Sequence, residues 1–152
     1  IYDNISALSV LHNGELCWRQ AAELKPNYRD GGLGVNDIVV AAYFILPRQS
    51  VPEIVEKVTE IRRQRRQRLP SGGHAGSVFK NPSGDYAGRM LDEVGCKGMR
   101  CGGARVADEH ANVIVAESGA TSRDITDLME KMRALVNRRY GVILESEIRL
   151  VS

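Results

Sequence analysis

The sequence predicts an α+β fold. Strand-like runs fill much of the first 46 residues, and helical apolar patterns follow at 54–61, 86–94 and 125–136, with shorter strand-like runs between them. No internal repeat or low-complexity stretch is present, which excludes a solenoid or a propeller. With 152 residues, 43% of them hydrophobic, the chain is long enough to bury a core.

A β-hairpin is expected near the start of the chain. The runs 7–11 and 15–18 are strand-like, and Asn13-Gly14 between them is a dipeptide typical of tight hairpin turns. The run 38–46 is β-branched and aromatic, which predicts a buried central strand. It is also the longest apolar stretch, and it is less than half of the roughly 20 residues that a membrane-spanning helix requires. We therefore expect no membrane partner.

A helix is expected after residue 50. Ser50 and Glu53 have the spacing of a capping box, and apolar residues then recur at helical spacing until Pro70 ends the pattern. The last turns carry five arginines: Arg62, Arg63, Arg65, Arg66 and Arg68. We expect them to face water, because cations at a helix C-terminus complement its dipole, with a patch for nucleic acid or nucleotide phosphate as the alternative.

The glycine-rich loop 71–76 leads into the polar residues Ser77, Lys80 and Asn81. From composition alone, a flexible linker is the simpler interpretation of this loop, and a loop that presents functional side chains is the alternative. A short helix at 86–94 follows, with Asp85 able to cap its start.

Short strands are expected at 99–106 and 111–116, with His110 closing the turn between them. The longest helix begins at Thr121 and ends at Gly141, and its methionines belong to the core. A last strand is expected at 142–144, and it leads into Glu145 and Glu147, which would point to the same face.

Charge and cysteine content narrow the function classes. The formal net charge of +2 is too small to indicate nucleic-acid binding. Three cysteines, an odd number in a chain of this size, make a disulfide framework unexpected and fit a reducing cytoplasm. Cys96, Cys101 and His110 match no zinc spacing, so we expect no metal site. The chain starts at Ile1 without a targeting segment, which suggests a cut.

Several motifs, read in order, resemble the C-terminal half of the UDP-N-acetylenolpyruvoylglucosamine reductase (MurB) family, flavoenzymes of bacterial cell-wall precursor synthesis. The motifs are Gly76-Ser77-Val78-Phe79-Lys80-Asn81-Pro82, Gly84-Asp85-Tyr86-Ala87-Gly88, Gly102-Gly103-Ala104, His110-Ala111-Asn112 and Leu144-Glu145-Ser146-Glu147-Ile148-Arg149. More weakly, Tyr28-Arg29 resembles a motif at the end of the family's flavin-binding domain, although Gly31 stands where a serine is usual. The short connection 46–70 resembles the subgroup without a tyrosine-bearing insertion.

The resemblance implies a domain organisation: the C-terminal part of an FAD-binding domain at 1–50, a connecting helix at 51–70 and a substrate domain at 71–152. It also implies a reaction. NADPH reduces FAD, and the flavin passes hydride to UDP-N-acetylglucosamine enolpyruvate, which becomes UDP-N-acetylmuramate.

By the same resemblance, the site residues have separate roles. Ser77 would donate the proton, while Arg29 and Glu147 would stabilise the enolate. Asn81, Lys80 and Tyr28 would bind substrate, with a surface role as the alternative for Lys80.

No glycine-rich flavin motif of the family's N-terminal half occurs in the sequence. The expected partner is therefore the missing FAD-binding half, and the chain alone is expected to be inactive. Two alternatives remain: a non-catalytic module that binds a UDP-sugar or, through its arginines, an RNA, and a purely structural piece with an unusually apolar exposed face.

Overall fold

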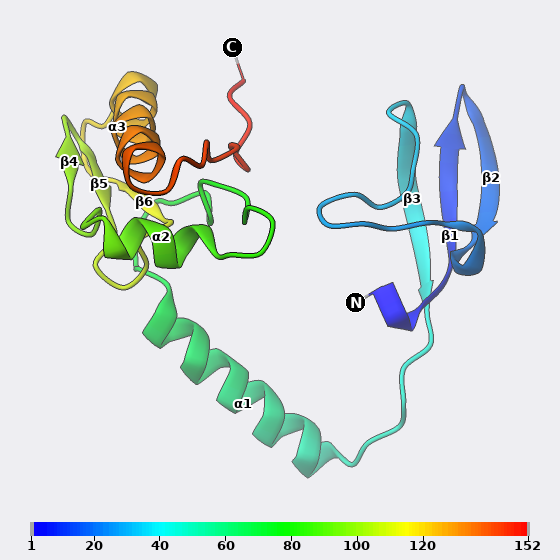
Figure 1. The fold of residues 1–152 in the computed structure, drawn as a ribbon. Helices are drawn as coiled ribbons and strands as arrows, with labels where there is room; N and C mark the ends of the chain where they lie inside the picture. Colours follow the sequence, from blue (N-terminus) through cyan, green and yellow to red (C-terminus); the bar gives the residue numbers. More distant parts are fainter. Residues whose placement is uncertain (1, 152) are drawn as a thin grey trace. The chain divides into compact units, whose positions relative to one another are not determined.

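The chain was obtained as a computed structural model that describes residues 2–151. It divides into two compact units, Ile1–Ile54 and Val55–Ser152, which we describe in turn (Figure 1). Each unit contains one antiparallel sheet, and the helices lie after the first sheet in the chain. The α+β prediction is confirmed.

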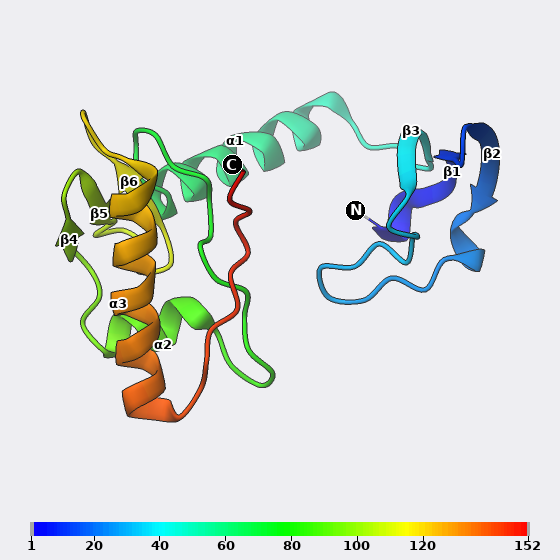
Figure 2. The same ribbon diagram turned by 90° about the horizontal axis from the view of Figure 1, so that it is seen from above.

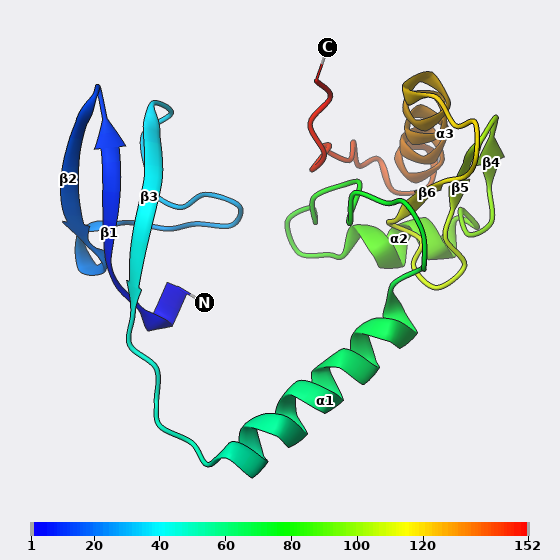
Figure 3. The same cartoon turned by 180° about the vertical axis from the view of Figure 1, so that it is seen from behind.

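The first unit is a three-stranded sheet in the order β2-β1-β3 (Figure 3). Its elements are η1 (Tyr2–Asn4), β1 (Ile5–His12), β2 (Glu15–Gln20), η2 (Ala21–Glu23) and β3 (Asp37–Phe44). The predicted hairpin is confirmed, since β1 and β2 pair antiparallel up to His12 and Glu15. Asn13 and Gly14 both have positive φ, 49° and 85°, which is what a tight two-residue hairpin turn requires.

The prediction of a buried central strand at 38–46 is correct in part. A strand forms there, but it lies at the edge of the sheet, and Ile38 and Tyr43 are 61% and 62% exposed. The central strand is β1, whose Val10 is fully buried. A β-branched, aromatic composition favours a strand but does not determine its place in the sheet.

Both faces of β1 are covered within this unit. On one face, Leu8 and Val10 pack with Leu24. On the other, the rings of Trp18 and Tyr43 lie 5.1 Å apart. These two residues come from strands on opposite sides of β1, so their contact ties the three strands together.

The helix α1 (Val51–Arg68) begins and ends as predicted. The capping box forms: the Ser50 N–H donates to Glu53 at 2.9 Å, and the Glu53 N–H donates back to the Ser50 hydroxyl. The side chains of Arg62, Arg63, Arg65 and Arg66 are exposed, as expected for a solvated end of the helix, and the side chain of the fifth arginine, Arg68, lies outside the described part of the chain.

The second unit packs two helices against a short sheet in the order β4-β5-β6. Its elements are α2 (Ala87–Glu93), β4 (Arg100–Cys101), β5 (Ala104–Val106), β6 (Ile114–Ala116) and α3 (Ser122–Tyr140). Three short strands therefore replace the two that we expected, because Gly102 and Gly103 divide the first into a hairpin. The methionines Met90, Met129 and Met132 are buried in the core, as predicted.

The ends of the two helices differ in how well the sequence predicted them. For α3 the predicted ends are confirmed: Thr121 caps the start in a capping box with Asp124, and Gly141 ends the helix in the left-handed conformation. For α2, the predicted cap by Asp85 is wrong, because the N-cap residue is Tyr86. The Asp85 carboxylate instead accepts from the Tyr86 N–H and forms an ion pair with Arg89 one turn later.

The predicted strand at 142–144 is also wrong. From Gly141 to Val151, the described part of the chain after α3, no residue belongs to a sheet, and an isolated bridge joins Ser146 to Phe79. In Figures 1 and 2 the C-terminal segment runs beside the loop that contains residues 71–85. Two backbone bonds join them: Lys80 N–H to Glu145 O at 2.9 Å, and Glu147 N–H to Val78 O at 2.8 Å.

Candidate functional site

A pocket of about 360 Å3 lies within the second unit, where three segments meet. The loop 77–81 contributes Ser77 and Asn81, the start of α2 contributes Gly88, and the turn before β6 contributes His110 and Asn112. Segments that the sequence analysis singled out separately therefore line one pocket. Polar side chains make up much of its wall, which suits a polar ligand.

The loop that carries Ser77 is held in place at Gly76 and at Ser77. Gly76, just before it, has a φ of 82°, and its N–H donates to His74 Nδ1 at 3.1 Å. Ser77 itself forms a bridge to Val113. The linker interpretation of this loop does not apply to Ser77, because its backbone is bonded to the segment leading into β6.

Asn112 is the residue that the sequence analysis quoted in a motif but gave no role. Its side chain is buried, with 3% of the residue exposed, and makes two bonds to one backbone unit: Oδ1 accepts from the Phe79 N–H at 2.9 Å, and Nδ2 donates to Phe79 O at 2.8 Å. Its carbonyl accepts from the Val78 N–H at 2.9 Å. The sequence contained one sign of this role: Asn112 is a polar residue within an apolar, strand-like run, and a buried polar side chain is almost always hydrogen-bonded.

Asn81 lines the pocket and also holds the start of α2. Its Oδ1 accepts the N–H of Ala87, the first residue of the helix, at 3.1 Å. This bond satisfies one of the backbone donors that a helix N-terminus leaves unpaired. The side chain therefore connects the Ser77 loop to the helix on the opposite side of the pocket.

Lys80 and Glu147 lie close to Ser77. Neither is among the described residues that line this pocket. The Lys80 ammonium forms an ion pair with Glu145, whose side chain is mostly exposed. Glu147 is half-buried, and its N–H bonds to Val78, the residue after Ser77.

Tyr28 and Arg29 belong to the first unit, so they are described apart from the residues above. They lie in a turn closed by paired backbone bonds between Asn27 and Asp30. Arg29 has a φ of 59°, an uncommon conformation for a residue with a side chain, and its guanidinium carbon is 5.0 Å from the centre of the Tyr28 ring.

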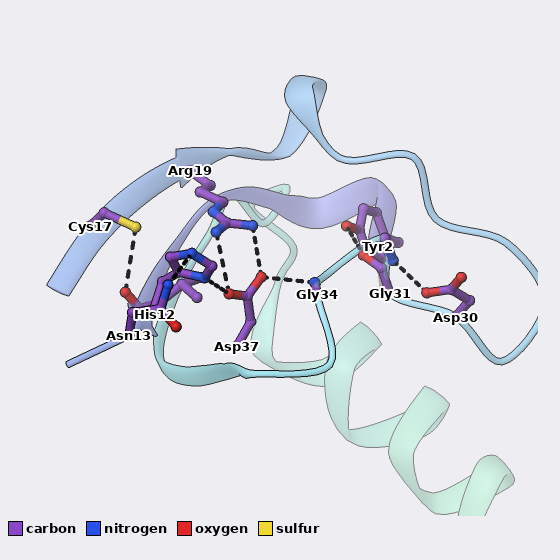
Figure 4. Close-up of polar contacts among 11 residues, drawn as sticks. Tyr2, His12, Asn13, Cys17, Arg19, Asp30, Gly31, Gly34 and Asp37 are labelled. Carbon is purple, nitrogen blue, oxygen red and sulfur yellow. Dashed lines mark hydrogen bonds and ion pairs between the residues drawn. The ribbon is translucent and has the colours of Figure 1, made fainter. Parts of the chain in front are cut away.

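Figure 4 shows a cluster of polar contacts around Asp37 in the same unit. The Asp37 carboxylate, only 1% exposed, accepts from Arg19 at 2.8 Å, from His12 Nδ1 at 2.5 Å and from the Gly34 N–H at 2.8 Å. The hydrogen bond from His12 is the largest of the effects that lower the pKa of Asp37. The sequence analysis did not predict this cluster.

The glycines of this unit do not fit the diphosphate of a flavin. The N–H groups of Gly32 and Gly34 are the kind of backbone donors that could hold a phosphate. They donate instead to the carboxylates of Asp30 and Asp37, at 2.9 and 2.8 Å. A phosphate would compete with two internal anions for these donors, so we assign no flavin contact to them.

Within residues 2–151, no three His, Cys, Asp or Glu side chains are grouped so that they could hold a metal ion. The same residues contain no helix long and apolar enough to cross a membrane.

Comparison with known proteins gives a consistent result. A family model described as "UDP-N-acetylenolpyruvoylglucosamine reductase, C-terminal domain" matches residues 67–151. A reductase of that name from Moorella thermoacetica is 42% identical over 127 residues, which cover 83% of this chain and 42% of the relative. One from Chloroflexus aggregans is 39% identical over 153 residues, covering 97% and 52%.

A solved structure is similar over almost the whole chain. The crystal structure of the MurB reductase from Thermus caldophilus has a TM-score of 0.83 and 33% sequence identity, and the match covers 97% of this chain and 53% of that one. The chain thus spans about half the length of the relatives it matches.

Proposed function

This chain belongs to the UDP-N-acetylenolpyruvoylglucosamine reductase (MurB) family, and from that premise we propose that it supplies the protonating half of such a reductase. The proposed reaction converts UDP-N-acetylglucosamine enolpyruvate to UDP-N-acetylmuramate for peptidoglycan synthesis in the cytoplasm. The proposed cofactors are FAD and NADPH, and the flavin supplies the hydride. The proposed partner of residues 71–152 is an FAD-binding domain that ends within residues 1–50, with 51–70 as the connecting helix.

The chemistry makes two demands on this chain's residues. The reduced double bond is conjugated to a carboxylate, so addition of hydride to its far carbon leaves negative charge on the near carbon, spread into the carboxylate as an enolate. That charge must be stabilised by nearby cations or donors, and the near carbon must then receive a proton.

We assign the proton donor to Ser77, and the observation that carries this assignment is the position of Ser77 in a polar pocket on a loop fixed by backbone bonds. A serine hydroxyl is a weak acid in water. It can act only where it is held within hydrogen-bond reach of the reacting carbon and water is excluded. The bridge to Val113 supports such a fixed position.

The remaining roles are proposals that follow from the family motifs. Arg29 would stabilise the enolate by its charge, and Glu147 would act at the same carboxylate end of the substrate. Asn81 and Tyr28 would bind substrate. Lys80 would act on the diphosphate only by leaving Glu145, the partner it has in this structure.

The test uses the protein made from the complete reading frame that encodes this chain. The flavin of this protein is first reduced by NADPH. Rapid mixing with the enolpyruvyl substrate then measures how fast the flavin is reoxidised. Ser77→Ala should leave reduction by NADPH unchanged and slow reoxidation by about 10²–10⁴-fold, the usual contribution of general acid catalysis. Ser71→Ala, an exposed serine at the start of the same loop, is the matched control. Normal reoxidation by Ser77→Ala would contradict the assignment.

The exposed arginines of α1 favour a second candidate, a module that binds an anionic ligand without chemistry. Arg65 and Arg66 line a hollow of about 410 Å3 together with His74. If an RNA is the ligand, its affinity should fall steeply with salt and should be lost when these arginines become Gln. If the affinity changes neither with salt nor when these arginines become Gln, this candidate is excluded.

A further inference from the structure

We infer that Asn112 is a positioning residue, which sets the conformation of the loop that carries Ser77 and Asn81. The inference rests on the proposed function, because it gives Asn112 its effect on the reaction through those two residues. Asn112 itself lines the same pocket, but its two side-chain bonds are made to the loop backbone.

These two bonds fix the backbone of one residue of the loop, Phe79. The Asn112 amide accepts from the Phe79 N–H and donates to the Phe79 carbonyl, so it satisfies both backbone groups of one residue, as a neighbouring strand would. Phe79 lies two residues after Ser77 and two before Asn81. A change at Phe79 therefore moves both pocket-lining side chains.

The second observation is that Asn112 is itself held in place. Its N–H donates to His110 Nδ1 at 3.1 Å. The His110 ring fits beside α2 because residue 88 is glycine: a Cβ there would lie 3.0 Å from His110 Cε1. Asn112 therefore connects the turn that contains His110 to the loop that carries Ser77.

Only a neutral amide, or a protonated acid, offers a donor and an acceptor side by side. Asn112→Asp keeps the shape but, when ionised, places a second acceptor against the Phe79 carbonyl. At lower pH the acid gains a proton and regains the donor. The Asp variant should therefore be defective at neutral pH and recover as the pH falls. This recovery separates positioning from a loss of packing, which protonation would not repair.

The experiment measures the rate at which the enolpyruvyl substrate reoxidises the flavin in the complete protein. The temperature is kept well below the melting temperature of each variant. We expect Asn112→Asp to lose about 10²-fold in the rate, the size expected for a misplacement of about 1 Å. Val136→Ala, which truncates a fully buried side chain on α3, is the control for lost stability and should keep its rate. Asn112→Ser, which is uncharged and too short to reach both Phe79 groups, replaces Asn112→Asp if that variant does not fold.

An activity-independent measurement on the 152-residue chain distinguishes this inference from the proposed function. Amide hydrogen exchange at Phe79 should lose protection in Asn112→Ala, which removes the acceptor of the Phe79 N–H, while Ala116, whose N–H bonds to Gly73, should keep it. Unchanged protection at Phe79, or a normal rate at neutral pH, would overturn the inference. A fully active Ser77→Ala would instead overturn the proposed function, and the exchange result would still decide whether Asn112 holds the loop.

Discussion

Arg19 binds the carboxylate of Asp37 through both of its terminal nitrogens, at 2.8 and 3.3 Å. Arg19 lies on β2 and Asp37 begins β3, so the ion pair joins the two outer strands of the first sheet past β1. His12, at the end of β1, donates to the same carboxylate. One buried anion therefore connects all three strands, and a charge-assisted pair of this kind has a larger effect than a neutral one.

The first prediction is that the stability of the first unit depends on Asp37 being ionised. Its pKa is lowered chiefly by the hydrogen bond from His12, with further contributions from the Gly34 N–H and the charge of Arg19. A lowered pKa in the folded state gives stability that is present above the pKa of the unfolded chain and is lost as the pH falls through the folded value. Thermal unfolding, followed by the fluorescence of the single tryptophan, Trp18, should show this loss in acid.

Asp37→Asn tests the same point by mutation. The variant should unfold at a lower temperature at neutral pH and should have a flatter dependence on acid pH than the parent chain. Asp3→Asn, which changes an exposed carboxylate of the same unit, is the control. Equal melting temperatures for Asp37→Asn and the parent chain would show that the cluster adds nothing.

The second prediction concerns Gly103, which the sequence analysis placed in a family motif. A Cβ at this position would lie 2.6 Å from Ala120 Cα, a backbone atom that cannot move without the chain around it. Gly103→Ala should therefore destabilise the second unit by about 1–3 kcal/mol, the usual range for overpacking. The control is Gly31→Ala, where no atom lies within 4 Å of the added methyl group. Urea unfolding measures both, and a neutral Gly103→Ala would refute the steric explanation.

The third prediction separates two roles of Asn81. Asn81→Ala removes the acceptor for the Ala87 N–H and should cost about 0.5–2 kcal/mol, as the loss of a helix cap does. Asn81→Asp keeps an acceptor for that N–H, so its melting temperature should stay near that of the parent chain. It lacks the amide donor and carries a negative charge, and it should therefore weaken binding of UDP-N-acetylglucosamine.

Two measurements on the parent chain, Asn81→Ala and Asn81→Asp separate the structural role of Asn81 from its binding role. They are calorimetric titration with UDP-N-acetylglucosamine and thermal unfolding. If Asn81→Asp binds the UDP-sugar as the parent chain does, Asn81 has only the structural role. If Asn81→Ala melts with the parent chain, the bond to α2 contributes nothing measurable.

Features decided by near neighbours could be predicted from the sequence. The Asn13-Gly14 turn and the capping box of Ser50 and Glu53 depend on residues at most three positions apart, and both form as expected. Features decided by distant partners could not. The bonds between Asn112 and Phe79 join residues 33 positions apart, and neither residue indicates in the sequence which residue is its partner.

The candidate site divides in the same way. Ser77 and Asn81 are four residues apart in one loop, and the structure brings them to one pocket. Lys80, in the same loop, forms an ion pair with Glu145, because the C-terminal segment runs beside the loop instead of forming the expected strand. The edge position of β3 is another case, since apolar composition does not reveal which strands pair.

The last prediction uses the Lys80–Glu145 ion pair to test the proposed role of Lys80. The pair is partly exposed, so Glu145→Gln should change the stability of the second unit by no more than about 1 kcal/mol. The backbone bond between the same residues stays intact, because it does not involve the carboxylate. If Lys80 acts on the diphosphate, its release in Glu145→Gln should strengthen UDP binding, and Lys80→Met should weaken it. If Lys80 serves only the surface ion pair, neither variant should change the affinity measured by titration with UDP.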